Sequence, residues 1–450
     1  MKYAVVTFGC RVNQADSLGF EEDLLAAGAV AASPQEADLV LVNSCSVTAS
    51  ADQGTRQTIR RIARDNPNAR IVVTGCYATR RPDEVAALPN VERVVLNDDK
   101  PRLIQLLRRA EGTAESAETA EKEFGSALLA VSAVSSGLGD GPCGAAIEPG
   151  VAGRTAFTLR VQTGCAEPCS YCIIPATRGL PRSVGVNDIV REVERITAAG
   201  FKEVALTGVH LGSYGRDLEP RSSLIDLLRA LDAEPLRSGS VRLQPDRDPR
   251  VLFRISSLEP MDCSREIVDL VASSGRFAPH FHLPLQHASN RVLATMRRPY
   301  TIEYYAALVD DIRSRIPNAS IGSDIIVGFP GETDDDVEQL AAYLARSPLT
   351  HVHVFPYSDR PGTPASAMAG KVRGEVVRER GRRIREIGRV LTDRFHAAQV
   401  GTVHRALTLD DGTIAVTGNY LKVRIPPGLM RNEWVRLRMT SQHDGELLRG

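Results

Sequence analysis

The chain has 450 residues, of which 43% are hydrophobic and 24% are charged, and its formal net charge is zero. This composition is typical of a folded protein with a large core, and the length predicts about three domains. No apolar run is long enough to span a bilayer, and the apolar stretch after Met1 is too short for a signal peptide. We therefore expect a cytoplasmic protein with no membrane contact.

The charge is spread unevenly along the chain. Residues 371–450 hold 16 Lys and Arg against 9 Asp and Glu, a net of +7, so the first 370 residues carry −7. A basic end on a neutral protein suggests local contact with a polyanion. The alternative is an ordinary solvated surface, which charge alone slightly favours.

The first part of the chain alternates between strand and helix patterns. This alternation predicts an α/β domain with a doubly wound parallel sheet, which we assign to residues 1–112. Residues 113–152 are dominated by Ala, Glu, Ser, Gly and Thr and predict a flexible linker. The expected strands are 2–8, 38–42, 70–74 and 94–96, and the expected helices are 13–27, 51–64 and 101–109.

The alternation returns in residues 153–385, where six β/α units predict a barrel or partial barrel. Residues 233–250 are rich in Arg, Asp and Pro and suggest an inserted loop. The expected strands are 157–161, 203–207, 252–256, 280–285, 320–327 and 351–356. The expected helices are 188–199, 224–231, 265–272, 291–296, 302–316 and 335–345.

The C-terminal part combines a long Arg-rich helix, expected at 375–398, with short alternating strands. The turn pairs Asp411-Gly412 and Gly418-Asn419 separate some of these strands and favour a small antiparallel β-barrel over residues 395–450. The expected strands are 402–409, 414–417, 421–425 and 433–439.

Eight cysteines in a cytoplasmic chain argue against structural disulfides and for metal or redox chemistry. Cys165, Cys169 and Cys172 form a C-x₃-C-x₂-C motif just after the first barrel strand. Three thiolates within eight residues can hold one face of a 4Fe–4S cluster and leave one iron open. A zinc site would normally add a fourth Cys or His nearby, and none follows. Chance clustering is disfavoured by the density of the motif.

Cys10, Cys45 and Cys76 form a second, dispersed set, in which each cysteine follows a predicted strand of the N-terminal sheet. Ligand sites of parallel sheets lie at the carboxyl ends of the strands, so these thiols are expected to converge on a second cluster. Gly9 and Gly75 would allow tight turns before the sulfur atoms. The alternative is three buried small residues.

The two remaining cysteines, Cys143 in the linker and Cys263 at a helix start, are expected to have no ligand role. The compact motif, with its aromatic Tyr171 before the third cysteine, resembles the radical S-adenosylmethionine superfamily. The resemblance implies that the open iron chelates S-adenosylmethionine, whose cleavage yields a 5′-deoxyadenosyl radical that removes an unactivated hydrogen. Tyr171 is expected to shield the cluster or to pack near the adenine.

Two cysteine sets in this order, followed by a six-unit barrel and a basic β-domain, resemble the methylthiotransferase family. The resemblance covers nearly the whole chain except the linker and residues 233–250, and it implies a C-terminal RNA-binding (TRAM-like) domain. His287 departs from the Ser that the family often has there. The motifs that carry the resemblance are 157–165, 169–175, 178–179, 207–212, 284–286, 296–300, 324–331, 355–358 and 360–363.

The sequence around the dispersed cysteines, at 9–14, 43–48 and 70–77, most resembles the branch that acts on N6-threonylcarbamoyladenosine in tRNA (MtaB-like). The resemblance implies two molecules of S-adenosylmethionine per turnover: one methylates a sulfur at the Cys10, Cys45 and Cys76 cluster, and the other is cleaved at the compact cluster. The radical then takes hydrogen from C2 of the adenine, and the methylthio group couples to that carbon.

Cofactor contacts are expected from the ends of the barrel strands that face the compact cluster. Arg298 and Tyr300 are candidates for nucleic-acid contact, with a surface ion pair and a packed ring as alternatives. Basic residues of the C-terminal domain, Lys422, Arg424, Arg431, Arg436 and Arg438, are expected to contact phosphates. The alternatives are tight turns at Gly208 and Gly328 and a loop cap at Asp324. The residues expected to contact S-adenosylmethionine are Thr207, Gly208, Ser256, Gln286, Asp324 and Gly328.

The expected partners are tRNA and an electron donor such as flavodoxin or ferredoxin, and we expect a monomer. One rival function is methylthiolation of isopentenyladenosine in tRNA or of a ribosomal protein side chain. A rival of another class is a non-catalytic iron–sulfur protein that binds RNA or carries electrons.

Overall fold

The computed structural model describes residues 1–111, 155–233 and 251–448. The described residues form two compact units: one holds 1–111, 162–166 and 173–192, and the other holds 155–161, 167–172, 193–233 and 251–448. The expected linker 113–152, Cys143 and nearly all of the expected insertion 233–250 lie outside the described residues. The domain boundaries given above therefore stay predictions.

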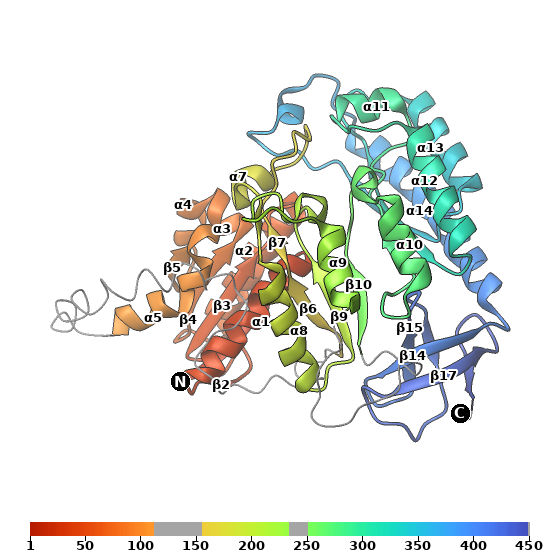
Figure 1. Cartoon of the computed structure of the whole chain (residues 1–450). Helices are drawn as coiled ribbons and strands as arrows, with labels where there is room; N and C mark the ends of the chain where they lie inside the picture. Colours follow the sequence, from red (N-terminus) through yellow and green to blue (C-terminus); the bar gives the residue numbers. More distant parts are fainter. Residues whose placement is uncertain (112–154, 234–250, 449–450) are drawn as a thin grey trace. The chain divides into compact units, whose positions relative to one another are not determined.

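The first unit is built on a five-stranded sheet in the order β2-β1-β3-β4-β5, in which every neighbouring pair is parallel (Figure 1). Strands and helices alternate along the chain, which confirms the predicted α/β class. The strands are β1 (Lys2–Thr7), β2 (Val30–Ala31), β3 (Leu39–Ser44), β4 (Arg70–Gly75) and β5 (Val91–Val95). The helices are α1 (Arg11–Ala26), α2 (Ala49–Asp65), α3 (Cys76–Arg80), α4 (Pro82–Ala86), the 3₁₀ helix η1 (Asn97–Arg102) and α5 (Leu103–Glu111).

Strand β3 shows why this sheet is covered by helices on both faces. All its residues are buried, as expected for a central parallel strand, and successive side chains point to opposite faces. Val40 packs in a core with Ile59 of α2, whereas Leu41 packs in a second core with Leu24 of α1. Burying each such side chain contributes about 1.5–3 kcal/mol. These two cores fix the carboxyl ends of the central strands at one edge of the sheet.

The second unit contains six parallel strands in two sheets, ordered β10-β9-β6 and β11-β12-β13. Six strands with intervening helices confirm the predicted partial barrel. The strands are β6 (Phe157–Arg160), β9 (Glu203–Thr207), β10 (Leu252–Ile255), β11 (His280–His282), β12 (Ser320–Val327) and β13 (His351–Pro356). The helices are α8 (Val186–Ala198), α9 (Leu224–Ala233), α10 (Arg265–Ser273), α11 (Asn290–Thr295), α12 (Ile302–Arg315) and α13 (Asp334–Arg346).

Short elements fill the turns between these strands and helices. Among them, α7 and the paired strands β7 and β8 belong to the first unit, although they lie within the barrel sequence. The short elements are β7 (Gln162–Thr163), α7 (Ile174–Arg178), β8 (Arg182–Ser183), η4 (Leu211–Ser213), η5 (Pro260–Asp262) and η6 (Pro364–Ala367).

The chain ends in a five-stranded antiparallel sheet in the order β16-β15-β14-β17-β18. Helix α14 (Gly374–Gln399) precedes it, and Phe395 of this helix packs against Ala406 and Leu437 on the inner face of the sheet. The antiparallel pairing confirms the predicted class of this part. The strands are β14 (Val403–Leu409), β15 (Ile414–Thr417), β16 (Lys422–Arg424), β17 (Trp434–Met439) and β18 (Gly445–Leu447). Within the described ranges, no helix has both the length and the hydropathy that a membrane crossing requires.

Candidate active site

The dispersed cysteines lie at one edge of the N-terminal sheet. Cys10 caps α1 after β1, Cys45 directly follows β3, and Cys76 directly follows β4. Because β1, β3 and β4 are neighbours and parallel, their carboxyl ends meet at this edge. Burial raises the pKa of Cys45 to about 11, and the nearby Cys10 and Cys76 thiols contribute to the rise. The three cysteines therefore lie at the ends of neighbouring strands on one edge of the sheet.

Two glycines make this approach possible. Gly9 and Gly75 have φ angles of 90° and 98°, which side-chain-bearing residues rarely adopt. A Cβ on Gly9 would lie 2.5 Å from Cys45 Sγ, and one on Gly75 would lie 2.2 Å from the Ser44 carbonyl oxygen. The backbone thus passes directly beside the neighbouring strand end before each of these two cysteines.

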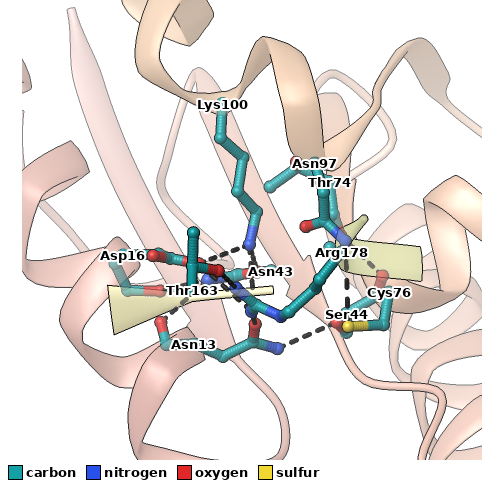
Figure 2. A network of polar contacts seen from close by, with 12 residues as sticks. Asn13, Asp16, Asn43, Ser44, Thr74, Cys76, Asn97, Lys100, Thr163 and Arg178 are labelled. Atoms are coloured by element: carbon teal, nitrogen blue, oxygen red, sulfur yellow. Dashed lines mark hydrogen bonds and ion pairs between the residues drawn. The ribbon is translucent and has the colours of Figure 1, made fainter. Parts of the chain in front are cut away.

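A buried polar network lies beside the same edge (Figure 2). Lys100 Nζ donates to Asp16 Oδ2 at 2.6 Å and to Asn43 Oδ1 at 3.0 Å. Asn13 Nδ2 donates to the carbonyl oxygens of Phe8 at 2.8 Å and Ser44 at 2.9 Å, which ties the loop before Cys10 to the end of β3. The network holds the ends of two cysteine-bearing strands in place.

Arg178 of α7 adds a second cation to the network. It is 3% exposed, and its guanidinium donates to Asn13 Oδ1, to Asp16 Oδ2 at 3.3 Å and to Thr163 Oγ1 at 3.2 Å. Burial would raise the pKa of Cys76, yet Arg178 and Lys100 lower it below its usual value. Asn97 Nδ2 also lies 3.8 Å from Cys76 Sγ.

These features fit a 4Fe–4S cluster held by Cys10, Cys45 and Cys76. Thiolates are the usual ligands of such clusters, and nearby cations stabilise the ionised thiol that a metal requires. The fit depends on three thiols converging from separate strands, on glycines that admit them, and on two buried cations beside one of them.

Local hydrogen bonds hold the backbone of the compact motif. Cys165 N donates to the Gly179 carbonyl oxygen at 3.0 Å, and Cys172 N donates to the Cys169 carbonyl oxygen at 3.2 Å. A Cβ on Gly164, just before the motif, would lie 1.9 Å from the Leu180 carbonyl oxygen. The donor set of three thiols in one loop fits a second 4Fe–4S cluster.

Arg298 holds a cysteine of the compact motif. Its Nη1 lies 3.3 Å from Cys169 Sγ, its Nη2 pairs with Glu259, and its Nε lies 3.1 Å from the Tyr300 hydroxyl. Both Arg298 and Tyr300 are buried, and the Tyr300 hydroxyl donates to the Pro284 carbonyl oxygen at 2.8 Å. Tyr300 is therefore a packed ring, and Arg298 forms a buried ion pair instead of a surface one.

Most of the residues expected to contact S-adenosylmethionine lie at strand ends. Thr207 ends β9, Ser256 directly follows β10, and Gly208 follows Thr207. Gly328 directly follows β12 with a φ of 78°, and Gln286, with a φ of 69°, donates its N–H to the Asp324 carbonyl oxygen at 2.8 Å. No ligand tests these contacts, so they stay predictions. Asp324 differs, because it lies inside β12 and its carboxylate faces two histidines.

Three further residues named from the sequence are packed among other side chains. His287 is fully buried, burial lowers its pKa to about 4, and its Nδ1 accepts from Ser289 N at 3.0 Å. Tyr171 packs against a cluster that includes Met296 and Phe329. Cys263 is buried, and burial raises the pKa of its thiol to about 12; its expected lack of a ligand role stays a prediction.

Sequence reasoning missed Asp16, Lys100 and the polar role of Arg178. One signal for Asp16 was present: the buried positions of α1 follow a helical period, and Asp16 and Asn13 occupy two of them. A carboxylate on the buried face of a helix requires a partner. No pattern in the sequence pointed to Lys100 or Arg178 as that partner.

Comparisons with known proteins agree with this geometry. Residues 2–97 match the model described as "Uncharacterized protein family UPF0004", and residues 159–344 match the radical SAM superfamily. The threonylcarbamoyladenosine tRNA methylthiotransferase MtaB of Aquifex aeolicus is 35% identical over 94% of this chain and 96% of its own length. The tRNA-2-methylthio-N(6)-dimethylallyladenosine synthase of Carboxydothermus hydrogenoformans is 32% identical over 90% of this chain and 87% of its own.

A solved structure shows the same fold. The radical S-adenosylmethionine methyltransferase TsrM of Kitasatospora setae matches with a TM-score of 0.54 at 17% identity, over 81% of this chain and 77% of that one. Family membership follows from the identity and coverage of the curated relatives, and both cysteine sets lie on the matched domains. The chain belongs to the radical S-adenosylmethionine tRNA methylthiotransferase family.

Proposed function

We propose that the chain attaches a methylthio group to C2 of N6-threonylcarbamoyladenosine next to the anticodon of tRNA. The observation that carries the proposal is the placement of Cys10, Cys45 and Cys76 at one sheet edge, because it offers a second cluster site, separate from the one that would cleave the cofactor, at which sulfur could be presented. Relatives named for this substrate match the chain at 33–35% identity.

Each cysteine set has a separate task in this proposal. Cys165, Cys169 and Cys172 would hold the cluster that binds S-adenosylmethionine, and the dispersed set would hold the cluster that presents sulfur. When bound, the clusters and S-adenosylmethionine supply a carbon radical that removes a hydrogen too weakly acidic for a side-chain base. Arg298 holds Cys169 in position, and Arg178 and Lys100 stabilise the thiolate of Cys76.

The outer face of the C-terminal sheet supports a role for tRNA. Arg405 of β14 and Arg436 of β17 are paired directly across the ladder, where two like charges repel. The Arg405 guanidinium also lies 3.7 Å from the centre of the Trp434 ring. Two cations in register, one of them stacked on an aromatic ring, suit a nucleic acid, which supplies both phosphates and bases.

Measurement of the cofactor content tests the first step. After anaerobic reconstitution we expect about eight irons per chain, and about four once Cys45 is replaced by Ala. Cys263→Ala, a buried cysteine outside both sets, serves as the matched control and should keep about eight. Zinc, or no metal, at the dispersed set would contradict the proposal.

Mass spectrometry of digested tRNA tests the substrate. A strain lacking the gene should retain N6-threonylcarbamoyladenosine without its methylthio group, and the intact gene should restore it. Loss of the methylthio group from dimethylallyladenosine instead would favour the second candidate, which relatives of that name at 32–33% identity support. Changed ribosomal proteins would favour a protein substrate.

The electron donor is proposed to be a flavodoxin or ferredoxin, and the enzyme is proposed to act as a monomer. An anaerobic assay for 5′-deoxyadenosine separates catalysis from the non-catalytic alternative. Release that depends on reductant and on Cys169 is expected. A chain with both clusters but no release would be an iron–sulfur binding protein.

A further inference from the structure

Three side chains from neighbouring barrel strands meet on one face of the second unit. His282 belongs to β11, Asp324 to β12 and His353 to β13, and β12 lies between the other two strands. Asp324 is in register with His353 across the β12–β13 ladder. Asp324 Oδ1 lies 3.2 Å from His282 Nε2 and 3.2 Å from His353 Nδ1. The donor atoms of all three side chains lie within 4.8 Å of one another.

The orientation of His282 differs from that of a simple ion pair. Its Nδ1 lies 2.9 Å from Ser257 Oγ, so that one ring nitrogen is already held. Its Nε2 is buried and has no hydrogen bond within the described residues, although Asp324 Oδ1 is only 3.2 Å away. A histidine that binds a metal through one nitrogen usually forms a hydrogen bond through the other. Ser257 occupies the place of that outer partner.

The surrounding backbone is shaped to let these strands present histidines side by side. Gly322 precedes Asp324 on the same face of β12 and is in register with both His282 and His351. A Cβ on Gly322 would lie 2.1 Å from His351 Nε2. The missing side chain therefore makes room for an imidazole beside the three donors.

We propose that His282, Asp324 and His353 form a binding site for one divalent cation. Two imidazoles and one carboxylate are a donor set for first-row divalent metals such as Fe²⁺, Mn²⁺ and Zn²⁺. Three protein donors leave coordination positions open. The side-chain exposure rises from 12% at His282 to 26% at Asp324 and 58% at His353, so one side of the site is accessible. The cofactor contact that the sequence predicts for Asp324 stays a separate prediction.

The open positions suggest a task for the cation, which rests on the proposed function. The threonylcarbamoyl group carries a carboxylate and a carbonyl oxygen, both of which bind divalent cations, whereas a dimethylallyl group carries no oxygen. Asp324 alone would repel that carboxylate, but a bound cation reverses the local charge. The cation would therefore favour threonylcarbamoyladenosine over dimethylallyladenosine as substrate.

Binding of Mn²⁺ to the anaerobically reconstituted full-length chain tests the site. Mn²⁺ prefers nitrogen and oxygen donors over thiolates. The electron paramagnetic resonance signal of free Mn²⁺ decreases as the ion binds, so its loss counts the bound ions. The wild type should bind one Mn²⁺ tightly, and Asp324→Asn and His353→Ala should each weaken binding at least tenfold. The control, His443→Ala, removes an exposed histidine from the turn between β17 and β18 and should bind as the wild type does.

Iron content shows whether each variant is still folded and loaded, since all should retain the wild-type amount. Ser257→Ala should weaken Mn²⁺ binding about tenfold, because it frees the His282 ring without removing a donor. Equal binding by the wild type and Asp324→Asn, or no binding by the wild type, would overturn the site.

A second measurement tests whether the bound cation contributes to substrate choice, independently of whether the site exists. Free N6-threonylcarbamoyladenosine, added to the Mn²⁺-loaded chain, should change the electron paramagnetic resonance spectrum of the bound Mn²⁺. N6-dimethylallyladenosine should leave that spectrum unchanged. Equal effects of the two nucleosides would overturn the role in substrate choice. Failure of the proposed function itself would show separately, in the tRNA of the deletion strain.

Discussion

Gly75 and Ser44 approach so closely that a Cβ on Gly75 would lie 2.2 Å from the Ser44 carbonyl oxygen. Gly75→Ala should therefore displace Cys76 from the end of β3 and reduce the iron content from about eight to about four per chain. Gly28→Ala is the matched control, because Gly28 also has a positive φ, of 79°, but has nothing within 4 Å of the added Cβ. Gly28→Ala should lower the free energy of unfolding by about 1 kcal/mol, because of the positive φ, and should retain the iron. A Gly75→Ala chain with full iron content would contradict this account.

Asp16 forms ion pairs with two buried cations, Lys100 and Arg178. Asp16→Asn should destabilise the N-terminal sheet by about 3–5 kcal/mol, because it leaves both cations without their carboxylate. Hydrogen exchange of peptides from β1 and β3 measures the local free energy of opening. Asp98→Asn removes an exposed carboxylate from an ion pair with Arg182 and should change it by less than about 1 kcal/mol. Similar losses in both variants would refute the role of Asp16.

His287 predicts a pH dependence of stability. Its pKa is about 4 in the folded chain, below the ordinary value of 6.5, because burial disfavours the charged ring. The unfolded chain therefore binds the proton first as the pH falls, and the wild type should lose about 2 kcal/mol between pH 7 and pH 5 through this residue. His287→Gln should lack that part of the loss, as measured by urea unfolding at each pH. His443→Gln should retain it, and an unchanged pH profile in His287→Gln would contradict the assignment.

Replacement of Arg436 tests the proposed contact between tRNA and the C-terminal sheet. Arg436→Ala should weaken tRNA binding and reduce the slope of log affinity against log salt concentration by about 1, as expected for one lost phosphate contact. Arg389→Ala removes an exposed cation from α14 that pairs with Glu386, and its salt slope should match the wild type. Equal slopes in all three proteins would place the tRNA elsewhere on the chain.

Long elements of the fold were predictable because their periodicity was clear. Strands β9, β12, β13 and β15 begin and end where the sequence predicts. Strands β2 and β18, with two and three residues, were missed because so few residues display no period. Helix α3 was missed because it starts at Cys76, directly after a strand and without a capping side chain.

The candidate site was predictable only where chemistry leaves a spacing in the sequence. The compact cysteines form a short, recognisable motif, and the dispersed cysteines recur about once per β/α unit. Both sets could therefore be predicted from the sequence. His282, Asp324 and His353 lie on three strands that are adjacent in space but far apart in the chain. Their proximity depends on strand order and register, which local patterns do not encode.

Arg178 gives the N-terminal sheet a dependence on a distant stretch of chain. This residue follows the compact cysteine motif, yet its guanidinium completes the buried network beside Cys76. A fragment that stops at residue 111 would keep all its strands but lose this cation and the Asn97–Thr177 hydrogen bond. The sheet is therefore a poor candidate for transplantation into another scaffold, because a cation beside Cys76 comes from a segment far along the chain.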